Sequence, residues 1–532
     1  MLALKGEGTT NLRVALGKEA DIGGRSFREG DVIDTGLDVP KGAIGPMGMT
    51  TKVLGTRTYA GVTCAACHSS VDPETKLVQH GVPNWDFNAG VMIAMASNSA
   101  AFFTHTDVDP RTIASTKSTR SIPDSTGTGS HALPDVATME QAVDAVLMKW
   151  PRGNFDSMTD MVAHPAQIPG AFTWNNHPYS HSGAFMAGPF KGLSVQTNNV
   201  HALNSDATTE ADAAPPRLGL DRELFIATVF QNAPHEKYRF DPAKGKKPSE
   251  FLLAIDPTPG QPSMNEVVAL PTYPKATLIE PTSLWNSSPG KPVWRQVNAM
   301  AAWQNTLVPP AARIPADPAA AQRGRAVFEK ANCVSCHRGP ALTNNRVVSV
   351  AEIKTQGLRG KGMANTENAW DDNPQAYAFD QDVPLPKSPR TIPVPTEQLD
   401  KQQITLAYGW GDSPGGYKVP SLIGLYWSPP YLHDGGVAVG PDASKQLGLA
   451  GTLQRGVMPD PANSLRAMVD RELRKQVIGA NAADPNLSAM RVEGIGHEIW
   501  VDAGAGFTEA DQHDLIHYLL TYQPDTSTTQ PR

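Results

Sequence analysis

Four cysteines, arranged as two widely separated C-x-x-C-H motifs, constrain this chain more than any other feature of its sequence. The first motif contains Cys64, Cys67 and His68, and the second contains Cys333, Cys336 and His337. C-x-x-C-H is the attachment signature of c-type haem. The two thiols form thioethers with the porphyrin, and the following histidine becomes the proximal ligand of the iron. The sequence therefore predicts two covalently bound c-type haems.

Three other readings of the cysteines fit the spacing less well. Disulfide frameworks belong to short secreted chains, whereas this chain has 532 residues and only four cysteines. A four-cysteine zinc site usually has its two pairs about 15–20 residues apart, but here the whole stretch from Cys67 to Cys333 separates them. A thioredoxin-like redox pair does not need a histidine directly behind it. Haem attachment is therefore the interpretation that uses every residue of both motifs.

Charge and hydropathy exclude two broad classes of function. The formal net charge is −7, so we expect no nucleic-acid-binding surface. No run of 18 apolar residues occurs, so we expect no membrane span. Covalent haem attachment in bacteria takes place outside the cytoplasmic membrane, which predicts a periplasmic or secreted protein. Residues 1–7 contain no apolar core of a signal peptide, so we expect the sequence to begin near a mature N-terminus.

The length predicts more than one domain, and a proline-rich segment from 308 to 318 is the expected boundary. Apolar periodicity predicts helices at 293–307 before it and at 319–330 after it, with Asp317 as cap and Pro318 at the first helical position. A third helix is expected from Thr508, where an acidic first turn precedes an apolar stripe. The predicted domains are therefore 1–307 and 308–532, each bearing one haem motif.

The region 105–290 lies inside the first half and is the least informative part of the chain. It contains helix candidates at 138–149 and 221–230, separated by segments rich in Pro, Ser, Thr and Asn. Gly and Pro number 46 each in the whole chain, above average usage. The fold class we expect is mainly α, with two cytochrome c-like haem domains, long loops and a large, loop-rich insertion in the N-terminal half.

One further stretch narrows the class of haem protein. Residues 417–422 read Y-K-V-P-S-L, and residues 430–436 read P-Y-L-H-D-G-G. This resembles the K-x-P-[ST]-L … P-Y-x-H-D-G stretch of the bacterial di-haem cytochrome c peroxidase and MauG superfamily. Residues 298–307 and 321–328 are similar to the family's helices on either side of the domain boundary. The length is similar to that of the expanded members, rubber oxygenases among them.

The resemblance implies a division of labour between the two haems. The haem on His68 would be the reactive one, at which hydrogen peroxide or oxygen binds. The haem on His337 would transfer electrons from a small redox protein, a cytochrome c or a cupredoxin. Members of the family often form homodimers and often hold a calcium ion between their domains. No compact acidic loop in this sequence identifies such a calcium site.

The sixth iron ligands are the next prediction, because they decide whether a haem binds substrate or only transfers electrons. For the second haem, the G-H-E stretch of the expanded family members points to His497 as the distal ligand, with Met458 and Met468 as competitors. For the first haem, His80 resembles the removable distal histidine of ordinary members, although the spacing from His68 is shorter. Its other reading is a pocket or surface histidine.

Catalytic candidates follow from the same resemblance. Peroxide cleavage needs a distal acid–base group, and Glu140 lies in the expected region, with a solvated helix residue as its other reading. Trp303 is a candidate electron relay or a core residue. Phe172 and Trp174 could line an apolar pocket.

His177 and His181 have the spacing of metal ligands, but Pro178 disfavours a helix there.

Three functions are consistent with these features. The leading one is a periplasmic di-haem peroxidase that reduces hydrogen peroxide at the first haem with electrons relayed by the second. The alternatives are a haem-dependent oxygenase that cleaves an apolar substrate, as rubber oxygenases do, and a non-catalytic di-haem electron carrier.

His433, in the H-D-G stretch, is expected to shape a loop against the second haem rather than to bind iron.

Overall fold

Helices and short two-stranded sheets make up the regular structure of this protein. The computed structural model describes residues 6–54, 56–117, 120–172, 207–255, 294–369, 375–377, 390–393 and 400–524. The helices are α1 (Ala65–His68), α2 (Ala89–Ala94), α3 (Pro110–Lys117), α4 (Val136–Leu147), α6 (Ala207–Leu218), α7 (Arg222–Phe230), α8 (Pro248–Ile255), α9 (Trp294–Gln304), α10 (Pro318–Lys330), α11 (Val350–Ile353), α12 (Lys401–Tyr408), α13 (Gly448–Gly451), α14 (Pro461–Val469), α15 (Arg471–Ala482), α16 (Pro485–Ala489) and α17 (Glu509–Thr521).

The strands pair two by two, and each described pair is antiparallel. The pairs are β1 (Arg13–Ala15) with β4 (Val32–Asp34), β2 (Ala20–Ile22) with β3 (Arg25–Phe27), β5 (Met49–Leu54) with β6 (Arg57–Val62), β7 (Ser69–Val71) with β8 (Val78–His80), β9 (Ser121–Pro123) with β10 (Ser130–Ala132), β11 (Asn154–Phe155) with β12 (Ala166–Gln167), β13 (Val347–Ser349) with β16 (Gly416–Lys418), and β14 (Gln375–Tyr377) with β15 (Thr391–Pro393). These short ladders brace loops and form no large sheet.

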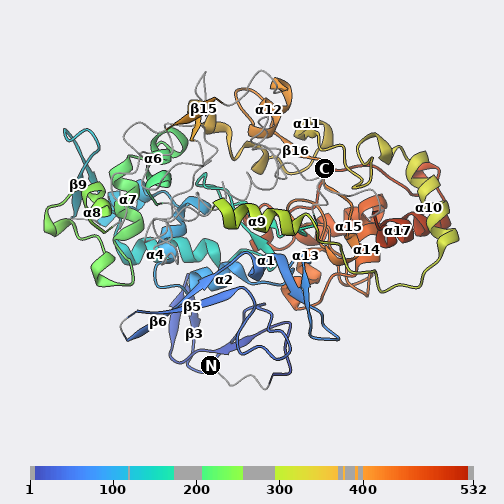
Figure 1. The fold of residues 1–532 in the computed structure, drawn as a ribbon, viewed down its shortest axis with the longest axis horizontal. Coiled ribbons are helices and arrows are strands. Elements are labelled where there is room, and N and C mark those ends of the chain that lie inside the picture. Colours follow the sequence, from blue (N-terminus) through green and yellow to red (C-terminus); the bar gives the residue numbers. More distant parts are fainter. Residues whose placement is uncertain are drawn as a thin grey trace.

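The helices expected on both sides of the predicted boundary are confirmed as α9 and α10. The Asp317 carboxylate accepts a hydrogen bond from the Ala320 N–H, and Pro318 opens α10. The terminal helix α17 has the expected capping box, in which Thr508 and Asp511 exchange hydrogen bonds. Helices α10 and α17 pack together at one end of the molecule (Figure 1). Gly324 makes this approach possible, because a Cβ there would lie 2.0 Å from the Asp514 carbonyl oxygen.

The region 105–290 contains more helix in its described parts than the sequence led us to expect. Helices α4, α6, α7 and α8 lie there, at the end of the molecule opposite to α10 (Figure 1). Every residue of α7 from Glu223 to Phe230 is buried, which marks it as a core helix. Helix α6 escapes a sequence search because Pro215 and Pro216 stand inside it, where proline usually ends a helix.

The core of this region extends into the C-terminal half. Phe103, Leu147 and Phe225 belong to one buried cluster with Leu449 and Leu487. The prediction that the chain divides at 307 into two haem domains stays a prediction, since this cluster joins residues from both sides.

None of the described helices has the length and apolar character needed to cross a bilayer.

Candidate haem-binding sites

Each C-x-x-C-H motif folds into a single tight turn. In α1 the His68 N–H donates to the Cys64 carbonyl at 2.9 Å, and in the second motif the His337 N–H donates to the Cys333 carbonyl at 2.8 Å. Residues three and four apart share a face of such a turn. Both thiols and the imidazole of each motif therefore face one side, as attachment to a single porphyrin requires. The four cysteines form no disulfide.

Both motif histidines are held by a backbone carbonyl group. His68 Nδ1 lies 3.1 Å from the Pro169 oxygen, and His337 Nδ1 lies 3.0 Å from the Leu342 oxygen. A carbonyl oxygen can only accept a hydrogen bond, so Nδ1 carries the proton and Nε2 keeps its lone pair. This is the second-shell arrangement that orients a metal-ligating histidine.

Burial keeps both imidazoles neutral and the thiols of Cys67 and Cys333 protonated. It lowers the pKa of His68 and of His337, against smaller upward effects of the carbonyl groups around them. It raises the pKa of Cys67 to about 12 and that of Cys333 to about 11. A neutral imidazole is the form that ligates iron, and thiols with high pKa values are not nucleophilic redox cysteines.

The second site has an additional imidazole that faces His337. The ring centroids of His337 and His497 are 6.2 Å apart. Two imidazoles bound trans to one metal at about 2 Å, with ring centres about 1.1 Å further out, have centroids roughly 6 Å apart. Burial, followed by His337 and Arg474, lowers the pKa of His497 to about 4. Its buried Nδ1 has no hydrogen-bond partner. The spacing and the orphaned nitrogen fit an iron held between the two rings.

The methionine competitors of His497 are placed differently. The Met468 sulfur accepts a hydrogen bond from Arg474 Nη2 at 3.1 Å, so a buried cation already uses its lone pair. Met458 is 37% exposed at the surface. These placements favour His497 as the distal ligand of the second site.

The structure brings together the two first-site residues His80 and Trp303. Their rings meet edge to face with centroids 5.3 Å apart. His80 ends β8, pairs in register with Ser69 and is exposed, and Trp303 of α9 is 46% exposed. Among the described residues, no second histidine ring is in contact with His68. Within the part of the chain that the structure describes, the first site therefore has no counterpart of His497.

Glu140, the candidate distal acid, holds the start of a short helix. Its carboxylate accepts hydrogen bonds from Ser99 N and Ser99 Oγ at 2.9 Å, from Ala100 N at 3.1 Å and from Asn232 Nδ2 at 3.2 Å. These bonds satisfy the free N–H groups of the 3₁₀ helix Ser99–His105. Its role as a distal acid stays a prediction, and the described contacts give it a structural function.

The H-D-G loop connects the two sites, which sequence reasoning missed. Asp434 Oδ2 accepts the N–H groups of Glu493 and Gly494, both at 2.8 Å, in the loop that carries His497. The His433 carbonyl accepts the Gln167 N–H at 2.8 Å, two residues before Pro169. The signal was visible as H-D-G in the sequence, but its partners lie far away along the chain.

An apolar cluster has members beside both motifs. It contains Val82, Phe172, Ala341, Ile423 and Trp427. Val82 follows Gly81, whose N–H donates to the His68 carbonyl. Ala341 precedes Leu342, whose carbonyl accepts the Nδ1 proton of His337. Trp427 is buried and donates Nε1–H to the Pro310 carbonyl at 2.7 Å. Trp427 is therefore a buried tryptophan in a cluster that reaches both motifs, whereas Trp303 is 46% exposed.

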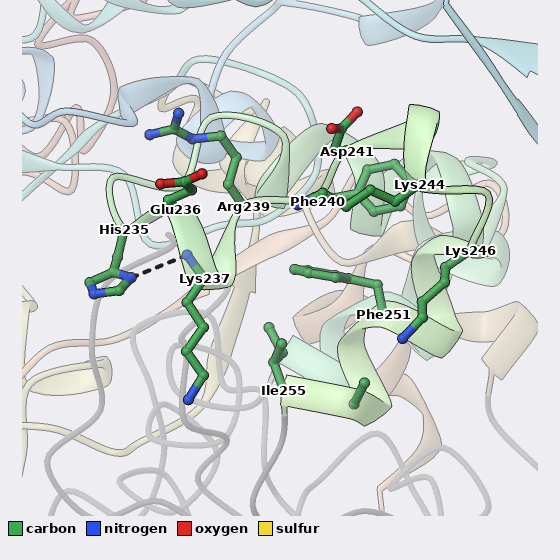
Figure 2. A pocket seen from close by; sticks show the side chains of 11 residues that line it. His235, Glu236, Lys237, Arg239, Phe240, Asp241, Lys244, Lys246, Phe251 and Ile255 are labelled. Carbon is green, nitrogen blue, oxygen red and sulfur yellow. Dashed lines mark hydrogen bonds between the residues drawn. The ribbon is translucent and has the colours of Figure 1, made fainter.

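A surface pocket of about 540 Å³ lies in the region of α8, and Figure 2 shows its lining. Phe240, Phe251 and Ile255 line its apolar side, and Lys237 and Lys246 are among its basic residues. None of its lining residues belongs to a haem motif.

The sequence candidates Trp174, His177 and His181 lie outside the described residues.

Comparison with known proteins gives one partial similarity. No protein-family model and no solved structure matches the chain. Over 165 residues it is 25% identical to the cytochrome-c peroxidase IdrP1 of Denitromonas iodatirespirans, a match that covers 26% of this chain and 37% of that protein. The match thus spans little more than a third of the relative. It indicates likeness to a cytochrome-c peroxidase over part of the chain.

Proposed function

We propose that this protein is a periplasmic di-haem peroxidase, with a cytochrome c-like haem domain in each half. The haem on Cys64, Cys67 and His68 would be the reactive one, and the haem on Cys333, Cys336 and His337 would transfer electrons. The observation that carries the proposal is the asymmetry between the sites, because His497 faces His337 at 6.2 Å and no described histidine faces His68. When bound, haem supplies a one-electron iron centre and, where a coordination position is open, a place for the oxidant.

The chain's own residues provide the rest of the machinery. His68 and His337 present Nε2, because Pro169 and Leu342 hold their Nδ1 protons. His497 closes the second site, so that only electron transfer is left to it. The apolar cluster that contains Trp427 has members beside both motifs, which makes its indole ring the candidate for an electron path between the sites. A small redox protein, a cytochrome c or a cupredoxin, would supply the electrons.

A haem-dependent oxygenase is the second candidate, and the placement of Glu140 favours it. Four hydrogen bonds already occupy that carboxylate, so it is poorly placed to move protons for peroxide cleavage. An oxygenase that acts on an apolar substrate has no need of this acid.

Spectroscopy with turnover separates these functions. We expect two covalent haems per chain, one high-spin and one low-spin electron paramagnetic resonance signal, and reduction of hydrogen peroxide by reduced cytochrome c. Two low-spin signals that persist on partial reduction, without turnover, would identify an electron carrier. Oxygen uptake with an apolar polyene, in the absence of peroxide turnover, would identify an oxygenase.

A further inference from the structure

Two arginines, Arg359 and Arg474, are the largest fully buried side chains of the described residues. Each is only 2% exposed. Burying a guanidinium is costly unless it is paired and hydrogen-bonded. Their partners therefore show which segments of the chain they hold.

Arg474 holds the loop that carries His497. Its Nη1 donates to the Gly494 and Gly496 carbonyls, both at 3.0 Å, and its Nε donates to the Ala467 carbonyl at 2.8 Å. Gly496 is the residue directly before His497, so this clamp holds the backbone from which the His497 ring projects. Arg474 therefore acts as a positioning residue for His497 at the proposed second haem site.

The first site depends on a different segment, residues 163–172, which we call the strap. Its Pro169 carbonyl accepts the Nδ1 proton of His68. Two backbone bonds tie the strap to the N-terminal half, from Ile168 N to the Gly153 carbonyl and from Ala171 N to the Gly81 carbonyl, both at 2.8 Å.

The C-terminal half grips the other end of the strap. Arg359 Nη1 donates to the His164 carbonyl at 3.2 Å and to Asp156 Oδ1 at 3.3 Å, and Arg359 Nη2 donates to Ser157 Oγ at 2.5 Å. The Asp156 side chain is fully buried, and its Oδ2 accepts the His164 N–H at 2.8 Å. Arg359 thus reaches His164 both directly and through Asp156.

Further contacts from the C-terminal half run along the same strap. The Gln167 N–H donates to the His433 carbonyl at 2.8 Å, and Gln167 Nε2 donates to the Ser428 carbonyl at 3.3 Å. Arg491 Nη1 donates to the Ala163 carbonyl. The backbone that carries the His68 anchor is thus fixed across the predicted domain boundary, and Arg359 makes the most buried of these contacts.

We propose that Arg359 is a positioning residue of the first haem site, which acts on His68 through the strap as Arg474 acts on the second site through the His497 loop. The inference rests on the proposed attachment of a haem at His68. It assigns to the C-terminal half a structural control over the proximal ligand of the opposite haem.

The expected consequence is electronic. A firm hydrogen bond donated by Nδ1–H makes a ligating imidazole more basic and so stabilises the oxidised iron. If the strap loosens, the Pro169 carbonyl withdraws and this effect weakens. The first haem should then become easier to reduce, whereas the second haem, anchored on Leu342, should be unaffected.

Redox titration of the two haems in the full-length holoprotein tests this. Arg359→Gln should raise the midpoint potential of the first haem by roughly 59 mV, a tenfold change in a one-electron equilibrium. Arg359→Lys, which keeps a charge beside Asp156, should produce a smaller shift in the same direction. Arg474→Lys is the matched control and should perturb only the second haem.

Three outcomes would overturn the proposal: no shift in any Arg359 variant, equal shifts of both haems, or a shift confined to the second haem. If the Arg359 variants do not accumulate, Ser157→Ala removes one bond to the guanidinium and should still raise the first potential. The titration needs no turnover, so an absence of peroxidase activity would break the proposed function and leave this inference standing.

Discussion

The two C-x-x-C-H sites are alike on the side of the motif histidine and different on the opposite side. Both form one turn, and both donate an Nδ1 proton to a carbonyl group. The second site also has a buried imidazole at 6.2 Å, supplied by the loop before α17. The first site has instead an exposed His80 packed on Trp303. The comparison teaches that the motif fixes the turn and the Nδ1 anchor of its own histidine, whereas distant loops determine which groups lie on the opposite side.

The strongest test of this comparison is removal of each proximal ligand in turn. His68→Gly should lower peroxide turnover more than about 100-fold, since loss of outer-shell partners alone costs 10- to 100-fold. The low-spin signal of the second site should persist. His337→Gly should remove that signal and leave a high-spin site at His68. The comparison would be broken if His68→Gly left turnover intact.

The second test concerns the facing imidazole. His497→Ala should convert the second haem from low-spin to high-spin, because the sixth position then loses its nitrogen ligand. His80→Ala is the control, since His80 is exposed and faces Trp303 rather than His68. It should leave the electron paramagnetic resonance spectrum unchanged. A low-spin second haem in His497→Ala would reject His497 as a ligand.

Sequence reasoning was most successful where the signal is local. The existence of α9, α10 and α17 and the starts of α10 and α17 follow from caps and periodicity, and the motif residues follow from spacing. In 105–290 the candidates at 138–149 and 221–230 are confirmed as α4 and α7, but α6 was missed because Pro215 and Pro216 conceal it. Arg359 and Trp427 could not be found from sequence, since their importance comes from partners about 100 to 200 residues away.

The third test is the path between the sites. Trp427→Phe should slow electron transfer between the haems roughly 10- to 100-fold, about 1.4–2.8 kcal/mol in the barrier, because phenylalanine is harder to oxidise and cannot bond to Pro310. Trp303→Phe is the control, since Trp303 is 46% exposed beside His80. Stopped-flow reduction of the first haem through the second measures both. Equal slowing in the two variants would show that the path does not depend on Trp427.

The fourth test separates a structural Glu140 from a catalytic one. Glu140→Gln places an amide N–H₂ near the Ser99 and Ala100 N–H donors and should lower the free energy of unfolding by about 1–2 kcal/mol, measured by denaturant titration. Turnover per folded molecule should change little. A distal acid would behave in the opposite way, with turnover reduced about 10²- to 10⁴-fold and stability preserved.

The smallest expected effect comes from Asp144, which shares Ser99 with Glu140. Ser99 Oγ lies 2.5 Å from Asp144 Oδ1 and 2.9 Å from Glu140 Oε1. The two carboxylates share this single hydroxyl donor, so each receives only part of its hydrogen bond. Burial, opposed by Ser99 and reinforced by Glu140, raises the pKa of Asp144 to about 7. In the unfolded chain the pKa of an aspartate is about 3.9.

The sign of the pH effect follows from these two pKa values. Between about pH 4 and pH 7 the unfolded chain releases a proton that the folded chain keeps, so the contribution of Asp144 to stability is lost as pH rises through this window. Asp144→Asn mimics the protonated form. It should match the parent near pH 4 and exceed it at pH 8 by on the order of 1 kcal/mol. A variant that is less stable than the parent at pH 8 would mean that the ionised carboxylate is needed there, and that the Glu140 cluster carries a charge the fold requires.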